Sequence, residues 1–173
     1  AMRDVPDLLT IERVEESIHL ADRTLKAAGY ERPRIVVAAY NPHAGDGGLM
    51  GDEEIRVIRP AVEKAQQKQV SCVGPLPSDT LWLKVRDGEY DAVVTMYHDQ
   101  GQIAIKLLGF DRGVSVLAGL PVPITTPAHG TAFDIAGQNT ANVVPSVNAF
   151  TMCLNMASNR KATDGVDSNR DAV

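Results

Sequence analysis

Three apolar runs in this chain each end at a polar, glycine-containing turn that carries a histidine. The central run, residues 91–96, stops just before His98, and the other two turns carry His43 and His129. An apolar run of strand length that stops at such a turn is typical of a buried parallel strand that delivers its last residues to a cleft. We therefore expect three of the four histidines to lie at strand ends.

The segment that follows Thr10 has the spacing of a helix. Thr10 is a candidate N-cap, and Gly29 stands where a C′ glycine belongs. Between them, apolar residues recur at intervals of three and four, namely Ile11, Val14, Ile18, Ala21, Leu25 and Ala28. This pattern predicts an amphipathic helix.

Strands and helices alternate along the rest of the chain. The predicted strands are residues 34–40, 70–73, 91–96 and 114–124, the last as an irregular or edge strand because it contains glycine and two prolines. The other predicted helices are residues 51–62, interrupted at Pro60, and residues 81–85, 102–108 and 145–156. Such alternation predicts an α/β fold, with a mainly parallel sheet and flanking helices.

Length and composition predict one globular domain. The chain has 173 residues, is 44% hydrophobic and 23% charged, and carries a net charge of −5. Without a basic excess, nucleic acid and anionic membranes are poor partners. No run approaches the roughly 20 apolar residues that span a bilayer, and the first six residues lack the apolar core of a signal peptide. A cytoplasmic protein is therefore expected.

The end of the chain differs in composition from the rest. Beyond Ala157 it consists mostly of small polar, charged and glycine residues, so residues 158–173 are expected to be a disordered tail. The two cysteines, Cys72 and Cys153, lie far apart and do not make a disulfide framework. Both are expected to be buried apolar thiols.

His43 and His98 are the best candidate pair for a metal site. Imidazole is the commonest neutral metal ligand, and a catalytic zinc typically takes three protein ligands. The two histidines are 55 positions apart, so only their placement at strand ends brings them together. Ordinary hydrogen-bonded cleft histidines are the alternative interpretation. Asp46 and Asp99 are candidates to orient the two imidazoles.

Three other polar positions carry weaker signals. Ser78 or Asp79 is a candidate N-cap for the helix that follows. Lys106 stands near the end of a predicted helix, where lysine is favoured electrostatically in any protein. None of these positions by itself indicates a function.

Residues 129–137 suggest a nucleotide contact. Gly130, beside a strand-end turn, permits close backbone approach to a phosphate, and Asp134 could accept hydrogen bonds from ribose hydroxyls. The chain contains no Gly-x-Gly-x-x-Gly and no Walker loop. A nucleotide would therefore bind through a different loop.

Four motifs, taken in order, resemble the 4-hydroxythreonine-4-phosphate dehydrogenase family of pyridoxal phosphate biosynthesis. They are Asn41-Pro42-His43-Ala44-Gly45-Asp46-Gly47-Gly48, Gly74-Pro75-Leu76-Pro77-Ser78-Asp79-Thr80, Met96-Tyr97-His98-Asp99-Gln100-Gly101 and His129-Gly130-Thr131-Ala132. Residues 129–142 also resemble the loop with which the metal-dependent isocitrate and isopropylmalate dehydrogenases bind the adenosine end of NAD.

The resemblance implies a two-domain α/β homodimer whose active sites lie at the subunit interface. A divalent metal, Zn, Mg or Co, is then held by three histidines drawn from both subunits, and His43 and His98 match two of them. The third belongs to a segment that would precede Arg3. Residues 1–157 are therefore expected to be the C-terminal half of a dehydrogenase, incomplete and inactive alone.

The resemblance also implies the reaction. The metal polarises a secondary hydroxyl of a phosphorylated substrate while hydride passes to NAD or NADP, and the resulting β-keto acid loses carbon dioxide. Lys106 matches a substrate-binding lysine, and Asp79 matches an acid of the active-site turn. The candidate cofactor contacts are His129, Gly130, Thr131, Ala132, Asp134 and Asn142.

Two positions depart from the family pattern. The substrate-binding asparagine and arginine of the family fall at Ser115 and Ile124 here, so Ser115 is the candidate substrate contact. Neither residue replaces the bidentate partner that arginine offers to a carboxylate or phosphate. The substrate stays open among 4-hydroxythreonine 4-phosphate, threonate or erythronate 4-phosphate, and a terephthalate dihydrodiol. For the chain alone, the alternatives are a non-catalytic dimerising or NAD-binding module and a bare structural domain.

Overall fold

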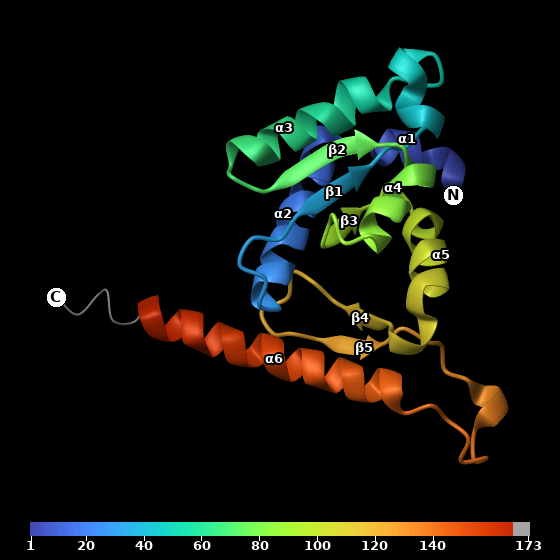
Figure 1. Cartoon of the computed structure of the whole chain (residues 1–173), viewed down its shortest axis with the longest axis vertical. Helices are drawn as coiled ribbons and strands as arrows, with labels where there is room; N and C mark the ends of the chain where they lie inside the picture. Colours follow the sequence, from blue (N-terminus) through green and yellow to red (C-terminus); the bar gives the residue numbers. More distant parts are fainter. Residues whose placement is uncertain (168–173) are drawn as a thin grey trace. The chain divides into compact units, whose positions relative to one another are not determined.

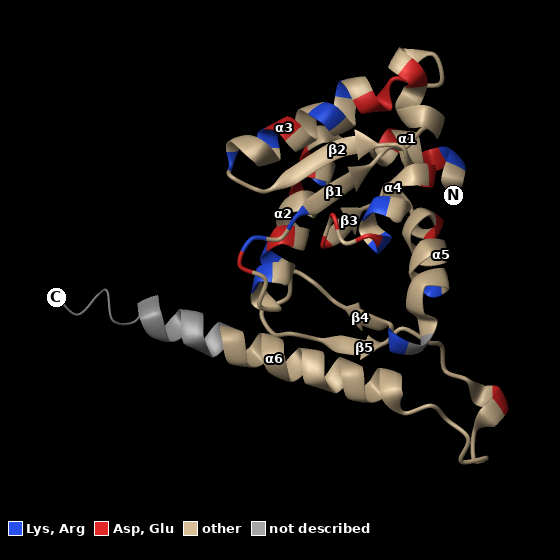
Figure 2. Cartoon of the chain, in the orientation of Figure 1, with Lys and Arg blue, Asp and Glu red and all other residues tan. Residues whose placement is uncertain are grey.

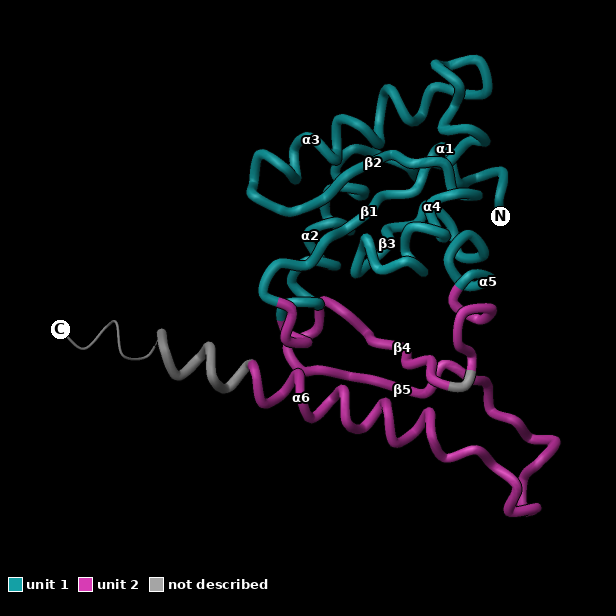
Figure 3. Tube along the Cα trace, viewed as in Figure 1, with its two compact units in different colours: residues 1–26, 31–104 teal, residues 27–30, 105–173 magenta. Residues whose placement is uncertain are grey.

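The computed structural model describes the backbone of residues 1–167 and the side chains of residues 1–110 and 112–159 (Figure 1). The chain divides into two compact units (Figure 3). The first contains residues 1–26 and 31–104, and the second contains residues 27–30 and the chain from residue 105. Length alone predicted one domain, whereas each of these units has a sheet of its own.

The first unit is built on a three-stranded parallel sheet. β1 (Ile35–Ala38) lies between β2 (Cys72–Leu76) and β3 (Ala92–Val94), and both neighbours run parallel to it (Figure 1). The first residue of β1 pairs with the first residue of each neighbour. The α/β fold with a parallel sheet, predicted from the sequence, is confirmed.

Helices precede, connect and follow these strands. They are α1 (Val5–Leu8), α2 (Ile11–Ala27), a π-helical turn η3 (Glu54–Ile58) that continues as α3 (Arg59–Gln67), α4 (Ser78–Arg86) and α5 (His98–Gly109). A short 3-10 turn (Met2–Asp4) precedes α1. Pro60 lies in the first turn of α3, so the predicted interruption corresponds to the change from π- to α-helix.

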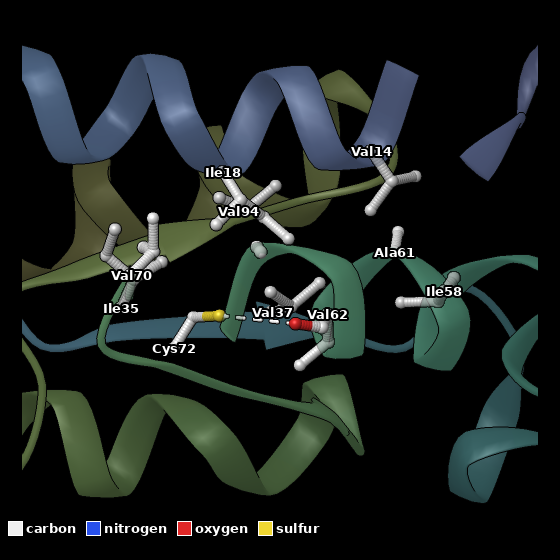
Figure 4. Close-up of a cluster of buried hydrophobic side chains, with 11 residues drawn as sticks. Val14, Ile18, Ile35, Val37, Ile58, Ala61, Val62, Val70, Cys72 and Val94 are labelled. Carbon is white, nitrogen blue, oxygen red and sulfur yellow. Dashed lines mark hydrogen bonds between the residues drawn. The ribbon is translucent and has the colours of Figure 1, made fainter. Parts of the chain in front are cut away.

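β1 is buried on both faces, and this explains its unbroken apolar sequence. Ile35 and Val37 pack in one cluster with α2 and α3 residues, shown in Figure 4. Val36 and Ala38 pack in a second cluster with Leu81 of α4. Because successive side chains of a strand point to opposite faces, every residue of β1 must be apolar.

Both ends of α2 follow their sequence signals. The backbone N–H of Arg13 donates to Thr10 Oγ1 at 3.2 Å, and Gly29 has a φ of +104° just beyond the last turn. A side-chain acceptor at the N-cap and a left-handed glycine at C′ satisfy the unpaired groups of a helix. The predicted helix is confirmed.

Several predicted boundaries are wrong, including those of β2 and α5. β2 continues to Leu76, so Gly74 and Pro75 belong to the strand and not to the turn after it. α5 begins at His98, four residues before its predicted start. Gly101 suggested a turn, but it lies within the helix, where an added Cβ would approach Thr95 Oγ1 to 3.2 Å. This glycine therefore permits close packing of the helix.

The second unit consists of a β-hairpin and a long helix. β4 (Val114–Val116) pairs antiparallel with β5 (Thr125–Pro127), and α6 (Val144–Asp167) packs along them. Thr125 Oγ1 donates to the carbonyl of Ala149 on α6 at 2.8 Å. Of the predicted strand 114–124, only the first three residues form β4, because its two prolines cannot donate to a ladder.

α6 runs from Val144 past Met156, where the sequence pattern ended the helix, to Asp167. The rest of the predicted tail, residues 168–173, lies outside the described residues. Residues 144–159 carry no charged side chain (Figure 2). Among the described residues, no helix has both the length and the apolarity needed to cross a membrane.

One face of α6 is apolar and exposed. Val147, Phe150 and Leu154 follow at helical spacing, and their exposed fractions are 57%, 71% and 55%. Exposed apolar patches of this kind are typical of surfaces that contact another protein.

The two cysteines are free thiols. Cys72 is buried in the core, and burial raises the pKa of its thiol to about 11. Cys153 is only partly buried, and its Sγ lies 3.5 Å from the carbonyl of Pro123. The prediction of buried apolar thiols is confirmed for Cys72 and holds in part for Cys153.

A bidentate ion pair joins the starts of β1 and β3. The Arg34 guanidinium donates to both carboxylate oxygens of Asp91 at 2.9 and 2.8 Å, and the Arg34 backbone N–H donates to the same carboxylate at 2.8 Å. The side-chain hydrogen bonds from Arg34, followed by the backbone one, lower the pKa of Asp91 to about 2.

We expect Asp91→Asn to lower the free energy of unfolding by about 1 kcal/mol at pH 7. Since the pKa of Asp91 is lower in the folded chain, its contribution is present above a pH of about 4 and is lost as the pH falls towards 2. Urea unfolding at pH 7 and near pH 2 should show the difference between variant and wild type shrinking with acidity. Asp87→Asn, in an exposed pair of neighbouring residues, is the control, and an equal loss in both variants at pH 7 would contradict the prediction.

Candidate active site

Three predicted site residues, His43, Asp79 and His98, lie in segments that follow the carboxyl ends of the three parallel strands. The chain leaves β1 through the segment Pro42–Gly48, which contains His43. β2 leads to α4, which begins at Ser78, and β3 leads to α5, which begins at His98. Since all three strands run in the same direction, these segments meet at one edge of the sheet. The predicted placement of His43 and His98 at strand ends is confirmed.

His43 lies in a left-handed turn. Five consecutive residues from His43 to Gly47 have positive φ, with values of 53°, 54°, 78°, 43° and 68°. Three of them are not glycine, and a left-handed conformation costs such a residue about 1 kcal/mol or more. The surrounding structure must therefore hold this turn in place.

Glu54 contacts the backbone where this turn begins. Its Oε1 accepts hydrogen bonds from the backbone N–H groups of Tyr40 and Asn41, at 2.9 and 2.7 Å. Its Oε2 accepts from Asn41 Nδ2 at 3.0 Å, and Asn41 Nδ2 also donates to Glu53 at 2.6 Å. Glu54 is 1% exposed. A buried carboxylate thus joins the start of η3 to the residues that follow β1.

Gln100 joins the three strand ends. Its Nε2 donates to the carbonyl of Ala39 and to Ser78 Oγ, both at 2.7 Å, and its Oε1 accepts from the Met96 backbone N–H at 2.8 Å. Ser78 Oγ in turn donates to the Ala39 carbonyl at 2.9 Å. Ser78 is the first residue of α4 and makes no capping bond, so its predicted role as an N-cap is wrong.

His98 is exposed on the first turn of α5. Its Nδ1 lies 2.7 Å from Asp99 Oδ1, and its side chain is 76% exposed. A carboxylate at Nδ1 favours the tautomer whose Nε2 lone pair is available to a metal. Asp99 thus has the geometry for the orienting role predicted from the sequence. Tyr97, just before His98, packs edge-on against Tyr40, with ring centroids 6.4 Å apart.

The described residues contain no complete metal site. In that part of the chain, no group of three or more His, Cys, Asp and Glu side chains could hold a metal ion. His43 and His98 come from segments that follow neighbouring strands and present imidazoles, the ligand type that zinc and similar ions prefer. As imidazoles they are suited to such an ion, which would take at least one further ligand.

Two further predicted residues lie on the helices that follow β2 and β3. Asp79 is exposed in the first turn of α4, where the helix dipole favours an acid. Lys106 is exposed near the end of α5, in the part of that helix that belongs to the second unit, where the dipole favours a cation. Neither side chain is buried in the core.

The predicted cofactor residues and Ser115 lie in the second unit. All six residues predicted to contact NAD are exposed in the connection between β5 and α6. The side chain of Asn142 accepts a hydrogen bond from the Val144 N–H at 3.0 Å and so also fixes the start of α6. Ser115 pairs with Thr126 across the hairpin, and both are exposed. These residues therefore belong to a different unit from His43 and His98.

Comparison with known proteins identifies the family. A family model described as the pyridoxal phosphate biosynthetic protein PdxA matches residues 1–153. The chain belongs to the PdxA family. This confirms the resemblance inferred from the four motifs.

Among PdxA relatives, the chain is similar to dehydrogenases with two named substrates. It is 50% identical over 157 residues to the 4-hydroxythreonine-4-phosphate dehydrogenase of Geobacter metallireducens, covering 91% of this chain and 46% of the relative. It is 54% identical over 136 residues to the D-threonate 4-phosphate dehydrogenase of Salmonella typhimurium, covering 79% and 42%.

A solved structure of the family has the same fold. The crystal structure of 4-hydroxythreonine-4-phosphate dehydrogenase from Klebsiella pneumoniae superposes with a TM-score of 0.79 and 46% identity, covering 91% of this chain and 48% of that one. The chain therefore spans about half the length of the relatives it matches.

Sequence reasoning missed Glu54 and Gln100. Glu54 appeared only as one of several acids at a helix start, and Gln100 only as part of a motif. The one available indication was that each is a polar residue in a segment expected to pack against the sheet. Their partners are as many as 61 positions away, so no local pattern could show them.

We expect Gln100→Met to lower the free energy of unfolding by about 2 kcal/mol, because methionine fills the space and leaves the Met96 N–H without its acceptor. Chemical denaturation of the chain measures this loss. Gln102→Met, two residues along the same helix and less buried, is the control and should change stability by less than about 0.5 kcal/mol. Equal losses of unfolding free energy in the two variants would show that the hydrogen bonds of Gln100 do not stabilise the chain.

Proposed function

We propose that this chain is part of a metal-dependent NAD(P) dehydrogenase that oxidises the secondary hydroxyl of a phosphorylated hydroxy acid. The observation that carries the proposal is the placement of His43 and His98 at the ends of neighbouring parallel strands in a PdxA-family chain. The matched relatives are named as dehydrogenases of 4-hydroxythreonine 4-phosphate and D-threonate 4-phosphate. Because the chain spans about half their length, the activity belongs to the full-length protein.

Each candidate residue has a definite task in this proposal. His43 and His98 hold the divalent ion, and Asp99 keeps the Nε2 of His98 turned towards it. A bound divalent ion supplies Lewis acidity at the substrate hydroxyl, and NAD(P) accepts the hydride. Lys106 offers an ammonium to the anionic substrate, and Asp79 offers a carboxylate that can accept a proton. Loss of carbon dioxide from the β-keto product completes the reaction.

A third ligand would enter beside α1. Residues of α1 and of the end of β3 line one cavity of about 260 Å³, which Val5 and Met96 both face. Val5 therefore lies close to the strand end that leads to His98. We propose that the third histidine, in a segment of the full-length protein before Arg3, reaches the site from this side.

The full-length protein is proposed to be a homodimer with a shared active site. The uncharged, exposed face of α6 formed by Val147, Phe150 and Leu154 supports a contact with a second copy. The sedimentation coefficient of the full-length protein tests this directly, because a monomer at micromolar concentration would exclude a stable dimer.

We expect His43→Ala and His98→Ala each to reduce bound metal in the full-length protein from about one equivalent per subunit to near zero. Each variant should be inactive. The wild type should lose activity after chelation and regain it when divalent metal is added back. Metal analysis of the purified proteins measures the first effect. His19→Gln, on α2, is the control and should keep its metal. Full metal content in either alanine variant would remove that histidine from the site.

Ser115 and Ile124 favour D-threonate 4-phosphate as a second candidate substrate. By resemblance, the family has asparagine and arginine at these positions, and an asparagine carbonyl can accept a hydrogen bond from the ammonium of 4-hydroxythreonine 4-phosphate. A serine hydroxyl both donates and accepts, so it can serve the hydroxyl that threonate carries at that carbon. Ser115 stands exposed beside Thr126, a second hydroxyl of the same kind.

The full-length protein should therefore have a kcat/KM for D-threonate 4-phosphate about tenfold above that for 4-hydroxythreonine 4-phosphate. Ser115→Asn should narrow this ratio, because it restores the amide. Steady-state kinetics with both substrates measure it, with Ser146→Asn, an exposed serine on α6, as the control. A ratio that favours 4-hydroxythreonine 4-phosphate in the wild type would reject the second candidate and leave the first.

A further inference from the structure

We infer that Glu54 is a positioning residue for His43, acting through the backbone of the left-handed turn. The inference rests on the proposed function, in which His43 binds a divalent metal. Glu54 itself is 1% exposed and makes its hydrogen bonds to Tyr40 and Asn41, so it acts on His43 indirectly.

The contacts of Glu54 define the path of the chain between β1 and His43. Its Oε1 accepts the backbone N–H groups of two consecutive residues, Tyr40 and Asn41. Two N–H groups that converge on one oxygen fix the direction in which the chain leaves the strand. Pro42 follows with a restricted φ, so His43 begins the left-handed turn from a defined position.

Two glycines, Gly45 in the turn and Gly51 after it, pack closely on Glu54 and Asn41. A Cβ added to Gly45 would lie 2.7 Å from Glu54 Oε2, and one added to Gly51 would lie 2.5 Å from Asn41 Nδ2. Both distances are shorter than a carbon atom can tolerate. The turn therefore rests directly on the Glu54–Asn41 pair, and a shift of that pair must move the residues around His43.

Both oxygens of the Glu54 side chain accept hydrogen bonds. Three N–H donors reach the two oxygens of Glu54, and a carboxylate accepts at both. A glutamine has the same shape, but its amide group can accept at only one end. At the other end its NH₂ would face Asn41 Nδ2, which already donates to Glu53. Glu54→Gln thus removes one interaction while keeping side-chain volume.

The experiment uses the full-length protein and two readouts. Hydrogen–deuterium exchange of peptides covering residues 38–51 is measured on metal-free protein, and Zn²⁺ affinity is measured by competition with a chelating dye. We expect Glu54→Gln to raise exchange in these peptides at least tenfold and to weaken Zn²⁺ binding at least tenfold. Glu54→Asp, whose carboxylate is one methylene short of its partners, should give the same direction of change.

The controls separate positioning from general destabilisation. Glu63→Gln, an exposed glutamate on α3, should change neither readout. Exchange in peptides from α6 should be the same in all variants. If Glu54→Gln does not fold, Asn41→Ala removes only the side-chain donor, and it should raise exchange in the same peptides to a smaller degree.

Two outcomes would overturn the inference. Unchanged exchange across residues 38–51 in Glu54→Gln would show that the carboxylate does not hold the turn. Faster exchange with an unchanged Zn²⁺ affinity would show that the turn does not position the ligand. A wild-type protein that binds no Zn²⁺ would instead reject the proposed function, while the exchange measurement would still decide whether Glu54 orders the turn.

Discussion

The carbonyl oxygen of Ala39 accepts hydrogen bonds from Ser78 Oγ and Gln100 Nε2 at the point where β1 ends. These bonds tie the first residues of α4 and α5 to the central strand, so three segments that are distant in sequence leave the sheet in fixed directions. The parallel sheet brings its polar ends together, but hydrogen bonds between side chain and backbone decide where each end points. The placement of His98 depends on this constraint, because α5 begins at that residue.

The two candidate ligands are held by different physical means. His98 stands on the first turn of a regular helix, and the buried amide of Gln100 anchors that helix two residues later. His43 stands in a left-handed turn whose conformation is unfavourable by itself and is held by Glu54 and the packing of Gly45. A helix start is stable through its own backbone bonds, whereas the turn depends on groups around it. A substitution in the surrounding structure should therefore displace His43 more readily than His98.

The sheet and its helices were predictable because burial leaves a periodic trace. The apolar run of β1 and the three- and four-residue spacing of α2 both follow from which side chains face the core. The start of α5 was not predictable, since Gly101 serves close packing against Thr95 and also resembles a turn glycine. The contacts of Glu54 and Gln100 were equally hidden, because they join residues 4 to 61 positions apart without any repeat. The motifs indicated the candidate site residues, but not the side chains whose hydrogen bonds fix their positions.

The backbone at His43 limits the chemistry that this position can offer. A residue with a φ of 53° is easily His, Asn or Asp, and a β-branched residue is strongly disfavoured there. Of these three side chains, Asn and Asp present oxygen and His presents nitrogen to a cation. In the proposed metal centre, substitution at position 43 would shift the preference from zinc-like ions towards magnesium-like ions without rebuilding the turn. The left-handed conformation of five residues would in this way limit the ligands that position 43 can offer to the proposed ion.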